Sequence, residues 1–274
     1  MPEQPAGSAA RWGALFDAGA ATWAETWEGP HGWGTPVYAY VLSQTRIGPG
    51  IRVLDCGCGA GRFVRLATER GARVAGIDAS RELVDIAAQQ CPDADLRVGD
   101  FQALPWPDRT FDVVTAFSTM QFADDHATAL AEAMRVSRGE IWVVVPTQPA
   151  ESGIARVFSF LADLFPAEDL ASLRHSGIFA LSAPGILEQA LSTAGLRVLA
   201  DETVAVPVVF ADVPSGVRAF LSAGATALAV RHAGLDAVKQ ALTSGLGSFA
   251  DAAGQVVLPG WFRVMQAGPA VIER

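Results

Sequence analysis

Short apolar runs alternate with helical patterns through the first half of the chain. Runs of strand length occur at residues 51–55, 73–78, 95–99, 111–117 and 140–146. Segments with helical spacing lie between several of them, at about 60–70, 80–90 and 125–136. Apolar strands separated by helices of this length favour βαβ units and a parallel sheet covered on both faces. The pattern therefore predicts an α/β fold.

The pattern changes after Pro146, where longer helical segments dominate. We expect helices over 150–175, 182–194 and 214–244, the last broken near Gly234, and strands over 196–207 and 255–267. Residues 1–50 are predicted to be a helical, aromatic-rich lead-in. The expected organisation is one α/β unit divided into a lead-in (1–50), a ligand-binding half (51–149), a helical insertion (150–181) and C-terminal core strands (182–274) with helices inserted at about 211–249.

The most informative stretch follows the first apolar run and reads AspCysGlyCysGlyAlaGly, residues 55–61. Glycines at alternating positions allow a tight turn and a close approach of the backbone to a ligand. A dinucleotide fingerprint started from Gly57 would need glycine where Arg62 stands. An acid ahead of the glycines would also repel a pyrophosphate, whereas it suits an ammonium group. The stretch thus argues against a nicotinamide-dependent oxidoreductase.

Two further acids end the next two predicted strands. Asp78 follows ArgValAlaGlyIle, and Asp100 follows LeuArgValGly. Ligands of open parallel sheets bind at the carboxyl ends of the strands, near the point where strand order reverses. We therefore expect Asp55, Asp78 and Asp100 to line one crevice, with Asp78 suited to accept hydrogen bonds from ribose hydroxyls.

Together these motifs resemble the class I S-adenosylmethionine-dependent methyltransferases, in particular the ubiquinone/menaquinone-type and small-molecule natural-product methyltransferases. The resemblance covers about residues 50–146. It rests on AspCysGlyCysGlyAlaGly, on ValAlaGlyIleAspAlaSer and on the stretch from ValGlyAspPheGln to PheAspValVal. It implies a doubly wound, Rossmann-like sheet of seven strands with helical lid insertions, and S-adenosylmethionine as cofactor with S-adenosylhomocysteine as product.

The resemblance also implies roles for single residues of the cofactor site. Gly57, Gly59 and Gly61 would pack against the methionine part of the cofactor, with Asp55 near its ammonium group. Asp78 would hold the ribose hydroxyls and Asp100 the adenine amine. Three further residues complete the expected site: Ala79 and Phe101 beside the adenine, and Phe117 beside the methionine.

No catalytic base is evident. Many similar enzymes carry histidine where this chain has Gln121, and an amide does not take up a proton near neutral pH. Gln121 could orient an acceptor or satisfy local backbone. His31, in the turn-rich lead-in, and His175, at the end of the first helical insertion, are the remaining candidates. His126 and His232 fall in helical patterns and are expected at the surface.

Asp124 and Asp125 could suggest a metal site, but the sequence favours a cap for the helix that follows. We expect no metal. The three cysteines, at positions 56, 58 and 91, lack a zinc spacing and are expected to be reduced thiols.

The net charge of the chain argues against some classes of binding partner. The chain carries 20 Lys and Arg against 29 Asp and Glu, a net charge of −9. Phosphate binding depends on clustered basic residues, so a nucleic-acid partner is not expected. The longest uncharged stretch, 29–45, is interrupted by prolines and glycines, so no membrane span is predicted. No secretory leader is apparent at the N-terminus, and a cytoplasmic enzyme is expected; its oligomeric state is left open.

Aromatic residues outside the predicted sheet suggest an apolar acceptor pocket under a helical lid. They are Trp23, Trp27, Trp33, Phe158, Phe160, Phe165, Phe179, Phe210, Phe220 and Trp261, together with Leu161. The expected function is methyl transfer to oxygen, nitrogen or carbon of a small, apolar metabolite. The alternative is a protein of the same fold that binds the cofactor but catalyses a cyclisation or rearrangement without methylation.

Overall fold

A seven-stranded sheet organises the chain. The structure, a computed structural model, describes residues 7–30 and 32–270. The strand order is β3-β2-β1-β4-β5-β9-β6. The five parallel strands are β1 (Arg52–Cys56), β2 (Arg73–Asp78), β3 (Asp95–Val98), β4 (Val113–Phe117) and β5 (Ile141–Pro146). β9 (Trp261–Pro269) runs antiparallel between β5 and β6 (Leu196–Ala205). The predicted α/β class and the doubly wound seven-stranded sheet are confirmed.

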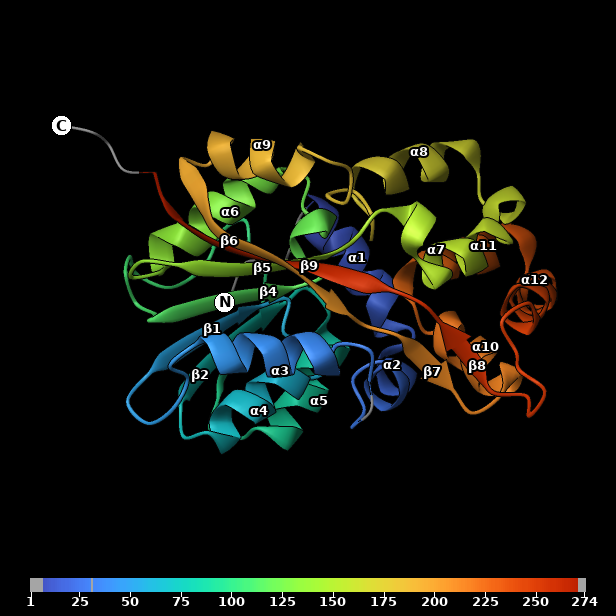
Figure 1. Ribbon diagram of the computed structural model, residues 1–274, viewed down its shortest axis with the longest axis horizontal. Coiled ribbons are helices and arrows are strands. Elements are labelled where there is room, and N and C mark those ends of the chain that lie inside the picture. Colours follow the sequence, from blue (N-terminus) through green and yellow to red (C-terminus); the bar gives the residue numbers. More distant parts are fainter. Residues whose placement is uncertain (1–6, 31, 271–274) are drawn as a thin grey trace.

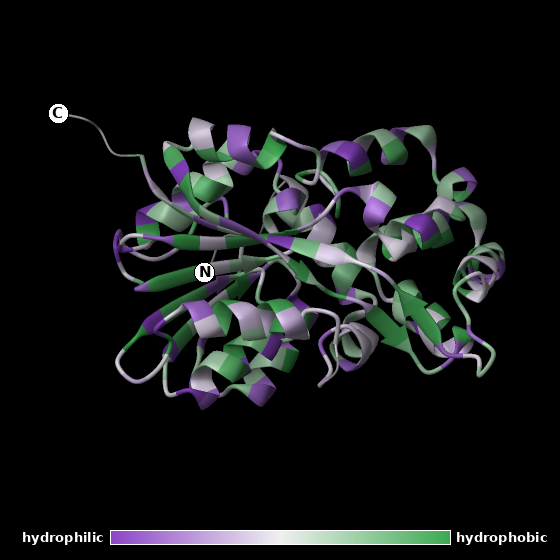
Figure 2. Ribbon diagram, viewed as in Figure 1, coloured by the Kyte–Doolittle hydropathy of each residue, from purple (hydrophilic) through white to green (hydrophobic). Residues whose placement is uncertain are grey.

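Helices cover both faces of this sheet (Figure 1). α3 (Thr35–Gln44), α4 (Arg62–Glu69) and α5 (Arg81–Gln90) lie on one side. α6 (His126–Val136) and α9 (Ile186–Thr193) lie on the other. Strands buried on both faces must be apolar at successive positions, and the central strands are accordingly green in Figure 2. Val53 and Leu54, neighbours on β1, are both fully buried and belong to cores on opposite faces.

The remaining elements gather beyond the carboxyl ends of the central strands (Figure 1). The lead-in forms α1 (Gly7–Asp17) and α2 (Ala20–Thr26), and the segment after β5 forms α7 (Gly153–Ser159) and α8 (Ala167–His175). The segment after β6 forms α10 (Val213–Leu221), α11 (Gly224–Ala233) and α12 (Leu235–Gly247). A third apolar core joins these layers: the Trp27 indole lies in it and donates a hydrogen bond of 2.8 Å to the carbonyl of Ala219.

Three boundaries differ from the sequence-based expectation. The expected last strand, 255–267, is two strands, because Pro259 and Gly260 interrupt it. Its first part, β8 (Val256–Leu258), pairs with β7 (Val208–Phe210) in a separate two-stranded sheet. The segment 214–244 is broken at Gly234 as expected, but a second break near Ser222 makes three helices. Segment 150–175 is two helices with short 3-10 turns between them. The division into four segments stays a prediction.

Across the described ranges, no single helix is long and apolar enough to cross a membrane. α10 and α11 together reach that length and composition, with a 90° bend between them. Ala219 and Phe220 of α10 and Ala229 of α11 are fully buried in the third core.

Candidate active site

A cavity of about 620 Å³ lies at the carboxyl ends of β1, β2 and β4. Its other walls come chiefly from the lead-in helices α1 and α2, from α7 and α8 of the first insertion and from the start of α11. β1 and β4 are neighbours in the sheet although β2 and β3 separate them in the chain, so strand order reverses here. This is the place where doubly wound sheets bind ligands, and the volume falls in the usual range of about 300–1,000 Å³ for such sites.

The three predicted acids meet at this cavity, as their spacing suggested. Asp55 is only 2% exposed and accepts a hydrogen bond of 2.8 Å from the Thr115 hydroxyl. Burial raises the pKa of Asp55 well above its usual range, and the nearby Glu28 and Asp78 carboxylates raise it further. Asp100 also lines the cavity and accepts a hydrogen bond of 2.8 Å from the Gln102 backbone N–H.

Asp78 fixes the glycine loop to the end of β2. One oxygen accepts from the Gly59 N–H and the other from the Ser80 N–H, each at 2.9 Å. Burial raises the pKa of Asp78, and these backbone hydrogen bonds oppose that shift. Ala79 lines the cavity next to it. The arrangement leaves Asp78 as an acceptor at the cavity wall.

The backbone conformation of the loop requires glycine at all three positions, and side chains packed against the loop also require it at Gly57 and Gly59. Gly57, Gly59 and Gly61 have φ of 72°, 53° and 88°, the left-handed region that side chains other than hydrogen rarely adopt. A Cβ at Gly57 would collide with the Thr119 side chain, and one at Gly59 with the Glu28 carboxylate. These glycines therefore allow other side chains of the protein, those of Thr119 and Glu28, to pack closely against the loop.

Glu28 is a site residue that the sequence reasoning missed. It follows α2 in the lead-in, and its carboxylate lies on the glycine loop and at the cavity wall. It accepts hydrogen bonds from Trp23 Nε1 (2.7 Å), Ala60 N (3.0 Å) and Arg62 N (3.3 Å). Burial raises the pKa of Glu28 to about 7; the hydrogen bonds from Ala60 and Trp23 oppose that rise, and the Asp78 carboxylate adds to it. No motif signals this residue, because its place depends on how the lead-in docks.

Ser118 is a second residue that sequence reasoning missed. It follows β4 with φ of 51°, an uncommon conformation for a side chain that is not glycine. Its hydroxyl is buried without a hydrogen-bond partner among the described residues, and the residue lines the cavity. Backbone strain of this kind concentrates at functional sites. Phe117, just before it, and Phe101 also line the cavity.

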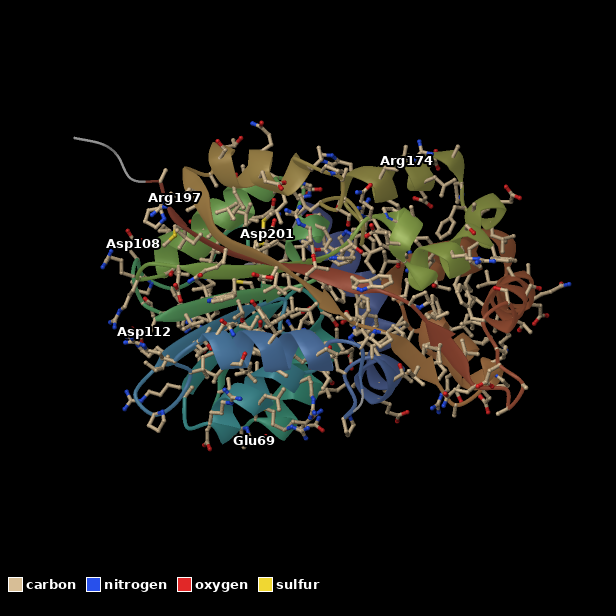
Figure 3. All side chains as sticks on the ribbon, in the orientation of Figure 1. Glu69, Asp108, Asp112, Arg174, Arg197 and Asp201 are labelled. Carbon is tan, nitrogen blue, oxygen red and sulfur yellow. The ribbon has the colours of Figure 1, made fainter. Side chains whose placement is uncertain are left out.

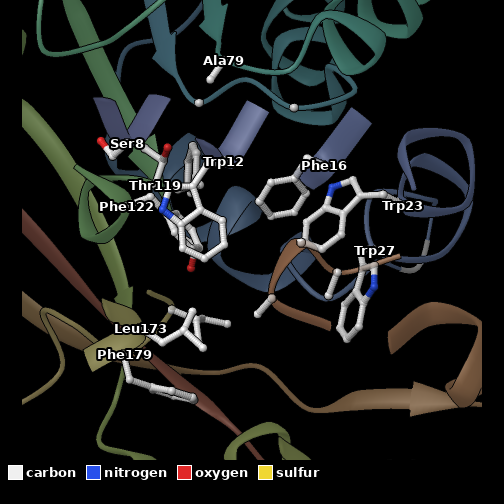
Figure 4. Close-up of a pocket in the computed structure, with 18 of the residues that line it drawn as sticks. Ser8, Trp12, Phe16, Trp23, Trp27, Ala79, Thr119, Phe122, Leu173 and Phe179 are labelled. Atoms are coloured by element: carbon white, nitrogen blue, oxygen red, sulfur yellow. The ribbon is translucent and has the colours of Figure 1, made fainter. Parts of the chain in front are cut away.

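The opposite part of the cavity is aromatic and apolar. In Figure 4, Trp12 and Phe122 lie between Ala79 on one side and Leu173 and Phe179 on the other. The rings of Trp12 and Phe122 are 4.7 Å apart and edge-on. The end of α8 is tied to α1, because the Trp12 indole N–H donates to the Ser176 hydroxyl at 3.1 Å. This hydrogen bond therefore holds the walls formed by α1 and α8 together at the aromatic end of the cavity.

The predicted aromatic set divides between the cavity and the cores. Six of its members line the cavity: Trp23, Trp27, Trp33, Phe158, Phe165 and Phe179. Leu161, Phe210 and Phe220 are buried in the third core instead. Phe160 and Trp261 are 42% and 39% exposed. Trp12, Phe16 and Phe122, which the sequence reasoning did not include, complete the aromatic end.

Two of the three candidate catalytic residues, Gln121 and His175, do not line the cavity. Gln121, in the short 3-10 helix Met120–Phe122, is fully buried, and neither amide atom has a partner among the described residues. His175 is exposed at the end of α8, with Nε2 3.3 Å from the Asp124 carbonyl. His31 lies outside the described residues. Of the described histidines, none lines the cavity. His232 is exposed as expected, whereas His126 is half-buried, and its burial lowers its pKa.

Asp125 caps α6, as predicted: its carboxylate accepts from the Thr128 N–H at 3.0 Å. Asp124 accepts from the Ser8 N–H at 2.6 Å and so ties α1 to this loop. The described part of the chain contains no group of three or more His, Cys, Asp or Glu side chains that could hold a metal ion. The three cysteines are buried and free.

Comparisons with known proteins agree with this geometry. Residues 54–145 match the methyltransferase domain family. Malonyl-[acyl-carrier protein] O-methyltransferase of Serratia marcescens is 38% identical over 90 residues, which are 33% of this chain and 35% of that protein. The Erwinia pyrifoliae protein of the same name is 29% identical over 191 residues, 69% of this chain and 67% of that one. The chain thus matches about a third of the Serratia protein's length.

Solved structures share the fold at lower identity. The YcgJ protein of Bacillus subtilis superposes with a TM-score of 0.56 at 17% identity, over 85% of this chain and 98% of that one. The [4+2]-cyclase SpnF superposes with a TM-score of 0.54 at 21% identity, over 86% and 80%. These likenesses concern the fold alone. Residues 54–145 thus match the methyltransferase domain family, and the solved structures show that the chain shares their fold.

Proposed function

We propose that the protein transfers the methyl group of S-adenosylmethionine to a small, predominantly apolar acceptor. The observation that carries this proposal is the division of one cavity into two ends. Four carboxylates and the glycine loop form one end, and aromatic side chains form the other. A zwitterionic nucleoside cofactor suits the first end, and an apolar acceptor suits the second.

The residues at the acidic end fit the cofactor. Asp78 would accept from the ribose hydroxyls, and Asp100, with Phe101 beside it, would receive the adenine. Asp55 and the loop Gly57–Gly61 would hold the methionine end, bordered by Phe117. The unpaired Ser118 hydroxyl is a further hydrogen-bonding group available to a ligand here. Ala79 would lie beside the adenine, and its small side chain would leave room for the ring.

When bound, the cofactor supplies a methyl group that is already electrophilic on its sulfonium. The protein then has to align an acceptor atom with that methyl group and exclude water, and alignment alone accounts for large rate accelerations. The aromatic walls contributed by Trp12, Phe16 and Phe122 would position the acceptor. The absence of described histidines from the cavity wall is compatible with this mode of catalysis.

The acceptor is proposed to be a small molecule of low polarity. Lining residues of the acceptor end are chiefly Trp, Phe, Leu and Ile, and Arg174, at its exposed edge, is the one cation among the described lining residues. Figure 3 shows other charged side chains, such as Glu69, Asp112 and Arg197, at the periphery of the molecule. A buried apolar site with few polar groups favours a metabolite over a nucleic acid.

Label transfer tests this proposal. The protein is incubated with S-adenosylmethionine carrying a tritiated methyl group and with a whole extract of bacterial cells, which is then separated into small molecules, protein and nucleic acid. We expect tritium in solvent-extractable compounds. Tritium confined to protein or nucleic acid would contradict the acceptor class. Binding of the cofactor with no transfer to any fraction would favour the non-methylating cyclisation or rearrangement.

A further inference from the structure

Glu28, in the lead-in, adds a fourth carboxylate to the acidic end of the cavity. Among the described residues, its oxygens accept from neutral donors alone: one indole N–H and two backbone N–H groups, of Ala60 and Arg62. The contact is close enough that a Cβ at Gly59 would collide with it. Glu28 therefore has a fixed position on the loop and a face on the cavity.

Among the residues that the structure describes, no cation compensates this cluster. The ion pairs found among residues 7–30 and 32–270 involve none of Glu28, Asp55 and Asp78. Arg174, the cation of the cavity wall, belongs to the other end and is exposed. Carboxylates gathered without a counter-ion oppose one another's ionisation. The acidic end is thus electrostatically incomplete without a positively charged ligand.

The pKa shifts of the three carboxyl groups agree with a buried acidic cluster. Burial raises the pKa of Glu28, Asp55 and Asp78 alike, and each of Glu28 and Asp55 is raised further by a neighbouring carboxylate. Further titratable groups near them are Tyr38 from α3, Cys58 from the glycine loop and Asp17 from α1. Burial raises the pKa of Tyr38 and of Cys58, and the neighbouring carboxylates raise both further. A cation in this end of the cavity would favour the ionised carboxylates.

The two ligands of the proposed reaction differ in charge at one atom. S-adenosylmethionine carries a sulfonium, whereas S-adenosylhomocysteine has a neutral thioether at the same place. Their adenine, ribose, ammonium and carboxylate groups are shared. An uncompensated acidic cluster distinguishes them through that one charge, because attraction to a cation is strong where water is excluded.

We propose that Glu28 is a specificity-determining residue of the cofactor site, an inference that rests on the proposed function. Its carboxylate, docked on the glycine loop without a counter-ion, favours the sulfonium of the substrate over the thioether of the product. The bound product would then be held less tightly than the substrate, which promotes exchange after each turnover. The lead-in would contribute to cofactor selection and not only to covering the site.

Calorimetric titration with three ligands tests this inference: S-adenosylmethionine, S-adenosylhomocysteine and sinefungin, which carries an amine in place of the sulfonium methyl. The measured quantity is the ratio of the product's Kd to that of each cationic ligand. Replacing Glu28 by glutamine keeps the size and one acceptor oxygen but removes the charge. We expect Glu28→Gln to lower the ratio about tenfold, as for loss of about 1.4 kcal/mol.

Two variants serve as controls. Glu25→Gln removes an exposed acid of α2 that does not line the cavity, and it should leave the ratio unchanged. Glu28→Asp keeps the charge but withdraws it from the loop by one methylene, and an intermediate ratio is expected even if Glu28→Gln does not fold.

The outcomes separate this inference from the proposed function. A wild-type ratio in folded Glu28→Gln or in Glu28→Asp would overturn the role of Glu28 and leave the methyltransferase proposal standing. Failure of the wild-type protein to bind any of the three ligands would overturn both.

Discussion

The carboxylate of Glu28 accepts a hydrogen bond of 3.0 Å from the backbone N–H of Ala60, 32 residues further along the chain. This contact joins the lead-in to the first turn of the glycine loop. It places an acid where α4 begins and its first backbone N–H groups lack helical partners. The lead-in is therefore part of the cavity wall and of its electrostatics.

Glu28 should make the stability of the ligand-free protein depend on pH. Burial raises its pKa from 4.5 to about 7, so the folded state holds the proton more tightly than the unfolded state. The contribution of Glu28 to the free energy of unfolding is therefore fully present below about pH 4.5. It is lost as the pH rises through 7, and the loss is no more than about 3 kcal/mol. Urea unfolding at pH 5 and pH 8 should show a smaller decline in Glu28→Gln than in the wild type.

Glu25→Gln, at an exposed position of the same helix, is the matched control and should keep the wild-type pH dependence. An equal decline in Glu28→Gln and the wild type would show that Glu28 is not buried as described.

Asp78→Ala should weaken binding of S-adenosylhomocysteine about tenfold or more. A charge-assisted hydrogen bond contributes about 1.5–3 kcal/mol, and the substitution also releases the Gly59 N–H that Asp78 holds. Asp85→Ala, at an exposed position of α5, should leave affinity unchanged. Equal calorimetric affinities in Asp78→Ala and the wild type would remove Asp78 from the site.

Much of the acidic end could be predicted from the sequence, because it is built locally. Asp55 and Asp78 lie at or near the ends of apolar strands, and parallel strands bring their carboxyl ends to one edge. Glu28 could not be predicted, since its role depends on the docking of α2 against an element far along the chain. The aromatic residues of α1 were missed for the same reason. Pro259 and Gly260, by contrast, were a local signal for the break before β9.

Gly59→Ala should destabilise the protein by about 1–3 kcal/mol, because it combines a positive φ with a collision against Glu28. Gly50→Ala separates the two causes, since Gly50 has φ of 84° and open space where a Cβ would stand. Chemical denaturation should therefore show a larger loss for Gly59→Ala than for Gly50→Ala. Equal losses would mean that backbone strain alone explains the glycine.

His175→Gln should leave methyl transfer within about twofold of the wild type. The ring is exposed, contacts the Asp124 carbonyl, and does not line the cavity, so it cannot take a proton from a bound acceptor directly. Initial rates of tritium transfer across pH 6–9 would check this. Loss of activity with an altered pH profile would instead assign the base to His175.

Calorimetric titration of the wild-type protein with S-adenosylhomocysteine, with NADH as the comparison, tests the central claim most directly. The acidic cavity at the carboxyl ends of β1 and β2 predicts saturable binding of S-adenosylhomocysteine in the micromolar range and no binding of NADH, whose pyrophosphate the acids repel. Binding of NADH, or no heat with S-adenosylhomocysteine, would contradict the assignment of this cavity as a methyl-donor site.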